Sequence, residues 1–300
     1  MSGPAMQTLT VRHVTTYLYD RPVRFGPHRL MFRPRDSHDL RLVSTGLAID
    51  PAARIRWIHD VFGNSIAIAA FEAEADRLVF DSTIRVEHYG AEAEDFSIED
   101  YARTYPFSYP TEEIPDIGRT IERHYADPEH SVDRWARRFV TEATPPGGSP
   151  ETFAILRAMT AAIPNAFAYS ERFTMGTRPP PETLAEASGT CRDLALLMME
   201  AARSLGFAAR FVSGYLYDPA LDGAESGIVG AGDTHAWVQI YLPGAGWVEF
   251  DPTNGLVGGP NLIRVAVTRD PSQALPLTGS YFGPADAFRS MTVEVEVRAG

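Results

Sequence analysis

The sequence is poor in the features that most often reveal a location or a cofactor. A single cysteine, Cys191, occurs among 300 residues, so neither an intramolecular disulfide nor a multi-cysteine metal cluster is expected. No stretch approaches the roughly 18 consecutive apolar residues that a membrane helix needs. The first residues carry neither the basic nor the apolar segment of a secretory leader. These absences predict a cytoplasmic protein that binds no membrane and needs no metal or other cofactor.

Positive charge is also scarce. The chain has 27 basic and 39 acidic residues and a formal net charge of −12. This balance argues against nucleic acid as a partner, because phosphate binding needs a basic face. Lysine is absent and every basic residue is arginine, which we attribute first to a GC-rich coding bias. The chain therefore offers no lysine amine that would attack an acyl-enzyme of its own kind. The sequence does not indicate an oligomeric state.

What remains is the composition of a folded protein. Hydrophobic residues make up 44% and charged residues 22% of the chain, as in soluble globular proteins with a core. Residues 8–89 contain short alternating segments separated by proline and Gly-Asn turns, which predict antiparallel strands. An acidic and then Pro/aromatic stretch over residues 90–116 indicates a linker. We therefore predict an N-terminal β-sandwich-like domain at 1–95 and a second domain at 96–300.

The second domain is predicted to contain both helices and strands. Helices are expected from Ser131, from Pro150 to about Ile163, and from Pro181. The strongest helix begins near Cys191 and ends before Gly206, the residue type expected just past a helix end. Strands are predicted at 207–217, 234–242 and 247–251. After Pro252 the chain is expected to loosen, and the strand Met291–Val297 is interpreted as the closing strand of this domain.

Cys191 lies where a loop of small residues meets this helix. The thiolate is the reactive form of cysteine, and the free N–H groups and dipole of a helix start stabilise negative charge. A cysteine nucleophile also needs a base and a third group that orients the base. A lone cysteine is more often a small buried residue, so the hypothesis depends on partners elsewhere in the chain. Asp193, in the first helical turn, is interpreted as structural.

A histidine and an aspartate on the following hairpin supply the missing partners. If Tyr241 pairs with Trp247, then His235 and Asp251 lie on one face of the sheet, one diagonal step apart. Such neighbours are about 7–8 Å apart at the backbone, which two side chains can bridge. A slip of one residue would place them on opposite faces. We therefore predict that His235 is the base for the thiol and that Asp251 orients its ring.

The reaction intermediate needs hydrogen-bond donors as well. The backbone N–H of Cys191 is the first candidate for an oxyanion donor, because it lies at a helix start. Tyr169 and Trp237 are weaker candidates for a second donor or for contact with the substrate. Asn254 is interpreted as a turn residue. The five N-terminal histidines are interpreted as surface or hydrogen-bonded strand residues and not as metal ligands: His13, His28, His38, His59 and His88.

Segments around these residues resemble the transglutaminase-like core of bacterial proteins. The segments are Gly189–Ala195, Leu205–Tyr215, Thr234–Val238 and Gly246–Asn254. In that family the matching positions of Cys191, His235 and Asp251 form a catalytic triad. The N-terminal region, with Val14–Tyr19 and Asp60–Asn64, resembles the domain that precedes this core in one bacterial branch. The resemblance implies a papain-like α+β core, in which a cysteine-bearing helix packs on an antiparallel sheet.

The resemblance leaves the reaction open. Members of this superfamily crosslink proteins, deamidate glutamine, hydrolyse peptide or amide bonds, or have lost activity, and the active ones form a thioester. We favour hydrolysis of a protein or peptide substrate, because water is always present and a crosslinking enzyme would threaten its cytoplasmic neighbours. Protein-glutamine transamidation and a silent peptide-binding module are the alternatives. A zinc enzyme that uses the same three side chains is a more distant one.

Overall fold

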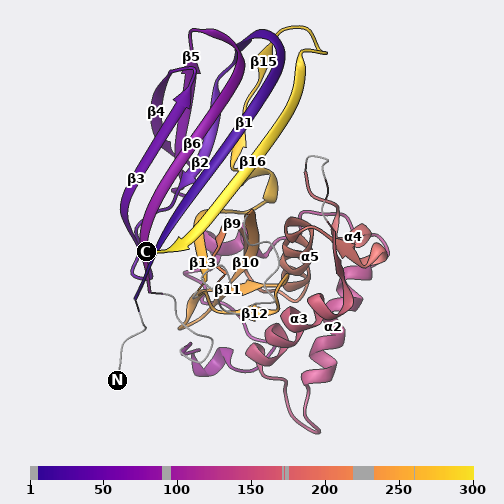
Figure 1. The fold of residues 1–300 in the computed structure, drawn as a ribbon. Helices are drawn as coiled ribbons and strands as arrows, with labels where there is room; N and C mark the ends of the chain where they lie inside the picture. Colours follow the sequence, from indigo (N-terminus) through magenta and orange to yellow (C-terminus); the bar gives the residue numbers. More distant parts are fainter. Residues whose placement is uncertain (1–5, 90–95, 171, 173–175, 219–232, 260) are drawn as a thin grey trace.

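Two packed antiparallel sheets form an elongated sandwich, drawn above the rest of the chain in Figure 1. The computed structural model describes residues 6–89, 96–170, 172, 176–218, 233–259 and 261–300. The first sheet has the order β15-β1-β6-β3, with β16 also paired to β1. Its strands are β1 (Gln7–Phe25), β3 (Leu40–Asp50), β6 (Glu74–His88), β15 (Tyr281–Phe282) and β16 (Phe288–Ala299). The second sheet, in the order β14-β2-β5-β4, contains β2 (His28–Arg33), β4 (Ala53–His59), β5 (Ser65–Phe71) and β14 (Leu277–Thr278).

The alternation of the N-terminal sequence explains the long strand β1. Leu9, Val11 and His13 are buried, whereas the residues between them are more exposed. Period-two burial is what a strand with one covered face requires. Farther along the sandwich, side chains such as Phe25 and Phe80 fill the space between the two sheets. The predicted N-terminal antiparallel β domain is therefore present.

The C-terminal strand belongs to this sandwich. β16 pairs antiparallel with β1, from Leu9 opposite Ala299 to Tyr19 opposite Phe288. β14 and β15 also pair with strands of the N-terminal region. The prediction that the last strand closes the second domain is wrong, because an alternating pattern reveals a strand and its buried face but not its partner. Residues 277–299 complete the sandwich instead.

The second part of the chain is an α+β core. Its five-stranded sheet has the order β12-β11-β10-β9-β13. The strands are β9 (Ala209–Leu216), β10 (Thr234–Leu242), β11 (Gly246–Asp251), β12 (Leu256–Val257) and β13 (Leu262–Thr268). The helices are α1 (Ile114–Ile121), α2 (Ser131–Ala143), α3 (Thr152–Ala166), α4 (Pro180–Glu186) and α5 (Cys191–Ser204), with 3-10 turns η2 (Asp100–Ala102) and η4 (Pro271–Gln273). A short parallel pair joins β7 (Ala168–Tyr169) to β8 (Ser188–Gly189).

Helix α5 lies at the centre of the core and packs on the sheet. Leu194, Leu197 and Met198 are buried in one cluster with Val238 and Ile240 of β10. Helices α2 and α3 cover other sides of α5 (Figure 1). The helix ends just before Gly206, whose φ of +88° is a conformation that glycine adopts without strain. The predicted cysteine helix on an antiparallel sheet is therefore observed. None of the described helices is long and apolar enough to cross a membrane.

Some elements were not expected from the sequence. Helix α1 begins in the last residues of the stretch 90–116 that was interpreted as a linker and continues past it, and β13 lies where the chain was expected to loosen. β13 is an edge strand of the core sheet, yet most of its residues are buried because the sandwich covers it. The acidic run at 91–95 lies outside the described residues.

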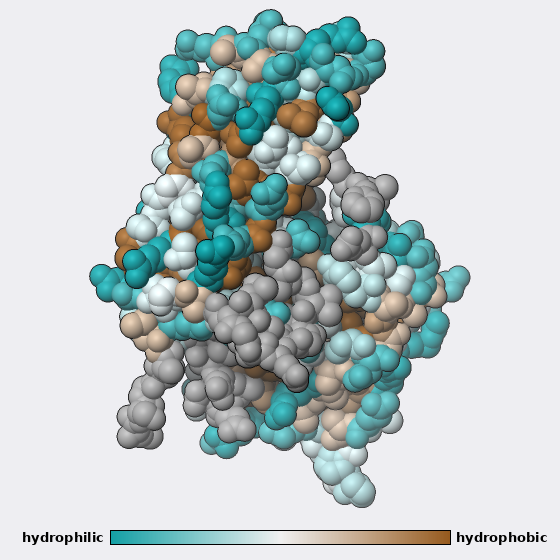
Figure 2. Space-filling view, viewed as in Figure 1, coloured by the Kyte–Doolittle hydropathy of each residue, from teal (hydrophilic) through white to brown (hydrophobic). Residues whose placement is uncertain are grey.

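The sandwich covers the face of the core sheet that α5 does not cover. Leu9 and Val11 of β1 share one buried cluster with Tyr215 of β9, Ile263 of β13 and Val297 of β16. On the outer face of the sandwich, apolar residues are exposed and appear as brown patches in Figure 2. The core sheet is therefore enclosed between helices on one side and a second domain on the other.

Polar contacts also cross this junction. The Nδ1 atom of His13 lies 3.0 Å from the hydroxyl oxygen of Tyr215. Asn64, in the turn before β5, donates to the carbonyl oxygen of Val267 at 2.8 Å and accepts from its N–H at 2.9 Å. Hydrogen bonds of this kind satisfy polar groups that the contact between the two parts removes from water. His13, His28 and His88 are buried and hydrogen-bonded, as predicted for strand histidines.

Candidate active site

Cys191 is the first residue of α5, and only 7% of it is exposed. The preceding residue, Thr190, caps the helix. Its Oγ1 accepts a hydrogen bond from the N–H of Asp193 at 3.3 Å, and the Asp193 Oδ2 accepts from the N–H of Thr190 at 3.1 Å. This reciprocal capping box fixes the backbone on both sides of the cysteine. The structural interpretation of Asp193 is confirmed.

Asp193 also forms hydrogen bonds with residues of the segment that precedes the cysteine. Its Oδ1 accepts from the N–H of Arg178 at 2.6 Å and from Nη2 of Arg172 at 2.9 Å. A Cβ atom added to Gly189 would lie 2.8 Å from the Cβ of Asp193, so only glycine fits between them. Tyr169 pairs with Gly189 across the β7–β8 ladder. Cys191 is thus presented by a segment with few conformational alternatives.

The β10–β11 hairpin brings His235 and Asp251 together. Tyr241 pairs with Trp247, which is the register that the sequence analysis required. The Nε2 atom of His235 lies 2.9 Å from Oδ2 of Asp251, and both side chains are fully buried. The predicted histidine–aspartate contact is therefore confirmed.

Residues after β11 hold the Asp251 carboxylate in place. Asn254 donates from Nδ2 to Oδ2 at 2.8 Å, and the N–H of Thr253 donates to Oδ1 at 2.9 Å. Burial alone would raise the pKa of Asp251, but His235 and these donors outweigh it and lower that pKa. The sequence analysis interpreted Asn254 only as a turn residue. Its three-residue spacing from Asp251 is the signal that could have revealed a side chain folded back onto the carboxylate.

The charge of His235 is set by its two partners. Burial lowers the pKa of an imidazole, but the negative charge of Asp251 and its hydrogen bond outweigh burial. The thiol of Cys191 acts in the same direction, and the net effect is a raised pKa for His235. Because Nε2 is bonded to Asp251, Nδ1 is the ring nitrogen available to the thiol. Nδ1 has no oxygen or nitrogen partner among the described residues.

The two weaker candidates lie in different environments. Trp237 is fully buried, and its ring stacks on the His235 ring with centroids 5.9 Å apart. It packs with Leu216 and Leu262, so it supports the imidazole from behind and does not face a substrate. This corrects the suggestion that Trp237 contacts the substrate. Tyr169 is 39% exposed and lies on the strand paired with Gly189, so its predicted role stays a prediction.

The arrangement has the parts that cysteine acyl transfer requires. A cysteine begins a helix, and a buried histidine bonded to an aspartate lies on the hairpin against that helix. As the first helical residue, Cys191 has a backbone N–H with no intrahelical acceptor, and it is a candidate oxyanion donor. No group of three or more His, Cys, Asp or Glu side chains in the described part of the chain is placed to hold a metal ion. Fold and site together define a papain-like α+β protein with a cysteine–histidine–aspartate set.

Comparison with known families assigns the chain more narrowly. Residues 9–87 match the bacterial transglutaminase-like N-terminal region, and residues 133–252 match the transglutaminase-like superfamily. The second match includes Cys191, His235 and Asp251. The chain therefore belongs to the transglutaminase-like superfamily, with the N-terminal region of its bacterial members.

Individual proteins are also similar to this chain. An uncharacterized Mycobacterium leprae protein is 37% identical over 114 residues, which cover 38% of this chain and 39% of that protein. An uncharacterized Mycobacterium tuberculosis protein is 27% identical over 279 residues, which cover 90% of this chain and 86% of the relative. A crystal structure from Cytophaga hutchinsonii, described as a candidate cysteine protease, has a TM-score of 0.72 and 18% identity, covering 98% of this chain and 91% of that one. That likeness shows that the two chains share their fold.

Proposed function

We propose that the protein is a cysteine-dependent hydrolase that acts on a peptide or amide carbonyl through a thioester on Cys191. One observation carries the proposal, namely the fully buried His235–Asp251 hydrogen bond beside a cysteine at a helix start. Burying an ionisable pair costs desolvation energy, so such a pair is often kept for a function. Activation of a nucleophile is a function that would explain this pair. The likeness of the fold to a candidate cysteine protease is in keeping with this reaction.

The first half of the reaction transfers the acyl group to the cysteine. Cys191 gives its proton to Nδ1 of His235, and the thiolate attacks the carbonyl carbon. The oxyanion that forms is stabilised by the backbone N–H of Cys191. The intermediate then expels the amine, which takes the proton from His235, and a thioester remains. Asp251 stabilises the imidazolium during both proton transfers.

Water completes the second half. His235 removes a proton from a water molecule, and the resulting hydroxide attacks the thioester carbonyl. The carboxylic acid leaves and the thiol of Cys191 is restored with the proton from His235. Water is favoured over an amine because water is always present, whereas an amine acceptor has to be supplied by a second molecule.

The test uses peptides in water enriched in the heavy oxygen isotope. A library of glutamine-containing and unmodified peptides is incubated with the full chain, with and without a primary amine, and products are weighed by mass spectrometry. Hydrolysis adds one heavy oxygen at the new carboxyl group, whereas transamidation adds the mass of the amine. We expect the heavy oxygen product, and Cys191→Ala is expected to lose at least about 1,000-fold in rate.

Variants of the partners make the test specific. Asp251→Asn is expected to slow the reaction by at least about 100-fold. It should also shift the pH profile downward, because Asp251 raises the pKa of His235. The matched controls are Asp76→Asn and His59→Gln, which change exposed residues of the sandwich. Equal turnover in wild type and Cys191→Ala would overturn the proposal. Amine incorporation would favour a transglutaminase. Peptide retention by both proteins without turnover would favour a binding module.

The substrate and the location remain proposals as well. A protein or peptide substrate is proposed because acyl transfer by a thioester requires an amide or ester carbonyl. A cytoplasmic location is proposed on the composition of the chain alone. The substrate is tested by capture: an acyl adduct on Cys191 after incubation with a cell extract would identify the substrate class by its added mass. The location is tested by fractionating cells and detecting the protein in each fraction.

A further inference from the structure

A cavity of about 420 Å³ lies at the junction between the sandwich and the core sheet. It is on the face of the sheet opposite α5. The loop before β3 and the turn before β5 form one wall, and residues of β9, β10, β11 and β13 form the other. Cys191, His235 and Asp251 are not among its lining residues. The cavity is therefore separate from the candidate active site.

The core wall of this cavity carries an arginine without an acidic partner. Arg210 donates from Nε to Oε1 of Gln239 at 2.8 Å, and its guanidinium lies 4.1 Å from the ring centroid of Trp247. Among the described residues Arg210 forms no ion pair. Burial and the charges of Arg264 and Arg35 outweigh the charge of Glu249 and lower the pKa of Arg210 to about 9. An anion at the free terminal nitrogens would stabilise the charged form of this guanidinium.

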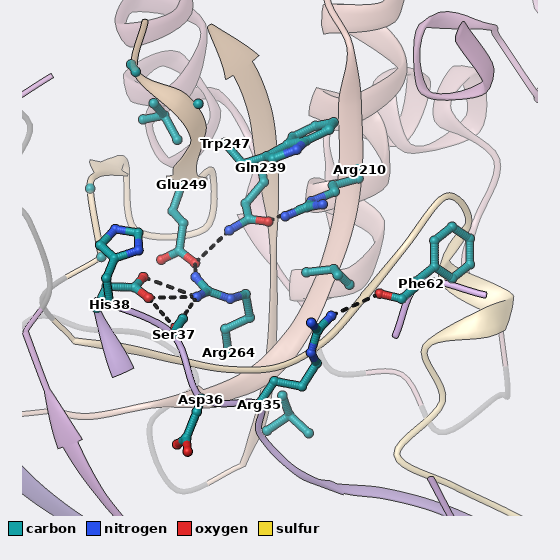
Figure 3. A pocket seen from close by; sticks show the side chains of 18 of the residues that line it. Arg35, Asp36, Ser37, His38, Phe62, Arg210, Gln239, Trp247, Glu249 and Arg264 are labelled. Atoms are coloured by element: carbon teal, nitrogen blue, oxygen red, sulfur yellow. Dashed lines mark hydrogen bonds and ion pairs between the residues drawn. The ribbon is translucent and has the colours of Figure 1, made fainter. Parts of the chain in front are cut away.

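A second arginine approaches from the sandwich side. In Figure 3 the guanidinium of Arg35 is turned toward the carbonyl oxygen of Phe62, that of Arg210 toward Gln239, and that of Arg264 toward Glu249. Arg35 donates only to the carbonyl oxygen of Phe62, at 3.2 Å, and has no carboxylate partner among the described residues. Two guanidinium groups from different domains thus line one cavity, and neither forms an ion pair with a carboxylate of the described residues.

The carboxylates of the cavity are occupied elsewhere. Arg264 is bound by Asp39 at 3.0 Å and by Glu249 at 2.7 Å. Asp36 accepts from the N–H of Leu42 at 2.5 Å, and it points away from the arginines in Figure 3. The remaining positive charge therefore belongs to Arg35 and Arg210.

We infer that this cavity binds a small organic anion, whose carboxylate or phosphate group is held by Arg210 and Arg35. The volume exceeds that of a free inorganic ion and matches small-molecule sites. Apolar side chains, including Phe62, Phe96 and Val267, line the rest of the space and suit an apolar body attached to the anion. Because one arginine comes from each domain, a bound anion also links the sandwich to the core.

The experiment uses three probes that share a phenyl ring: benzoate, phenyl phosphate and the neutral benzamide. Each is titrated calorimetrically into the full chain at low salt. At least one anion is expected to bind with a dissociation constant below about 1 mM, at least about tenfold tighter than benzamide. The ratio between benzoate and phenyl phosphate distinguishes a carboxylate ligand from a phosphate ligand.

Matched variants locate the bound anion. Arg210→Gln is expected to weaken binding by at least about tenfold and Arg35→Gln by a few fold. Arg77→Gln, an exposed arginine of β6, should leave affinity unchanged. Arg35 is exposed, so its variant keeps the test valid if Arg210→Gln does not fold. Cys191→Ala is expected to bind as wild type does, whatever the outcome for catalysis.

Four results would overturn the inference. The first is no saturable binding of either anion, and the second is equal affinity for benzamide. The third is unchanged affinity in both Arg210→Gln and Arg35→Gln. Loss of binding in Cys191→Ala would place the anion at the candidate active site and would also contradict it.

Discussion

A buried imidazole at the domain junction shows how position sets the charge of one residue. His13 is 2% exposed, and its two ring nitrogens lie 3.0 Å from the hydroxyl oxygens of Tyr215 and Thr15. Burial lowers the pKa of His13 from 6.5 to about 4, because no acid compensates for the lost hydration. The ring therefore stays neutral in the folded protein over the pH range in which the unfolded chain takes up a proton.

The stability of the protein should fall as the pH drops through this range. Between pH 6.5 and about 4 the unfolded state binds the extra proton, so stability declines with falling pH. Between pH 7.5 and pH 4.5 the free energy of unfolding should decrease in both proteins. We expect the decrease to be about 2–3 kcal/mol smaller in His13→Gln than in wild type, as measured by urea unfolding. The exposed His59→Gln serves as control and should follow wild type. Parallel curves for wild type and His13→Gln would contradict the assignment.

Single residues differed in how far the sequence could predict them. His235 and Asp251 were placed together because strand alternation and one assumed pair, Tyr241 with Trp247, determine their register. Trp237 was misjudged because its ring packs with Val212 and Leu216 of the neighbouring strand β9, a tertiary contact that the sequence does not show. Asn254 was missed because its contact with Asp251 depends on a turn geometry that several residue types allow.

At the scale of elements, the start of α5 depends on one carboxylate. Asp193 accepts from the N–H groups of Thr190 and Arg178 and from the Arg172 guanidinium. We expect Asp193→Ala to destabilise the protein by about 3 kcal/mol, since it removes a helix cap and leaves buried donors without partners. Urea unfolding measures the change, and the rate of the proposed reaction should also fall because Cys191 is presented by the same segment.

The control for this prediction is an acid that begins another helical turn. Asp100 starts η2 and its side chain is 92% exposed. Asp100→Ala is expected to change stability by no more than about 0.5 kcal/mol. A loss of similar size in both variants would show that the Asp193 contacts do not contribute specifically.

Elements with a clear period were predictable and elements defined by tertiary contact were not. The strand at 234–242 and the helix after Cys191 appear at nearly their predicted bounds, because alternation, helical spacing and glycine breaks agree there. Helix α1 is only eight residues long and lies in a Pro-rich context, so its pattern resembles a linker. β13 has no clean alternation, because both of its faces are largely buried.

For the whole molecule, one arginine connects three segments that are distant in sequence. Arg264 of β13 binds Asp39 of the sandwich and Glu249 of β11. Burial would raise the pKa of Asp39, but the charge of Arg264 and the hydrogen bond from Ser37 outweigh it and lower that pKa to about 2. The carboxylate of Asp39 therefore stabilises the fold above pH 3.8, and this stabilisation is lost as the pH falls toward 2.

We expect Asp39→Asn to lower the free energy of unfolding by about 2 kcal/mol at pH 7 and by about half as much at pH 3. The reason is that Asp39 in wild type begins to take up a proton in the unfolded state at the lower pH. Urea unfolding at the two pH values measures the difference. Asp76→Asn, which alters an exposed acid of β6, should match wild type at both. A pH-independent effect of Asp39→Asn would contradict the role of its charge.

The types of the two domains were predicted from the sequence, but the pairing of the last strand was not. The antiparallel β domain and the α+β core both follow from local patterns and from the family resemblance. The pairing of β16 with β1 joins residues up to 290 positions apart, as with Leu9 and Ala299, and no local pattern encodes so distant a contact. The cavity at the junction is invisible in the sequence for the same reason, since its arginines come from separate segments.

The pairing of β1 with β16 has a consequence for the order of events on the ribosome. β1 is synthesised before the core, whereas its neighbour along residues 9–19 is synthesised only after the core. Domains generally fold as units as they emerge. This sandwich has to wait with one edge of β1 unpaired while the whole α+β core is synthesised. A nascent chain stalled before residue 288 would thus carry an open strand edge, which makes it a natural client for chaperones.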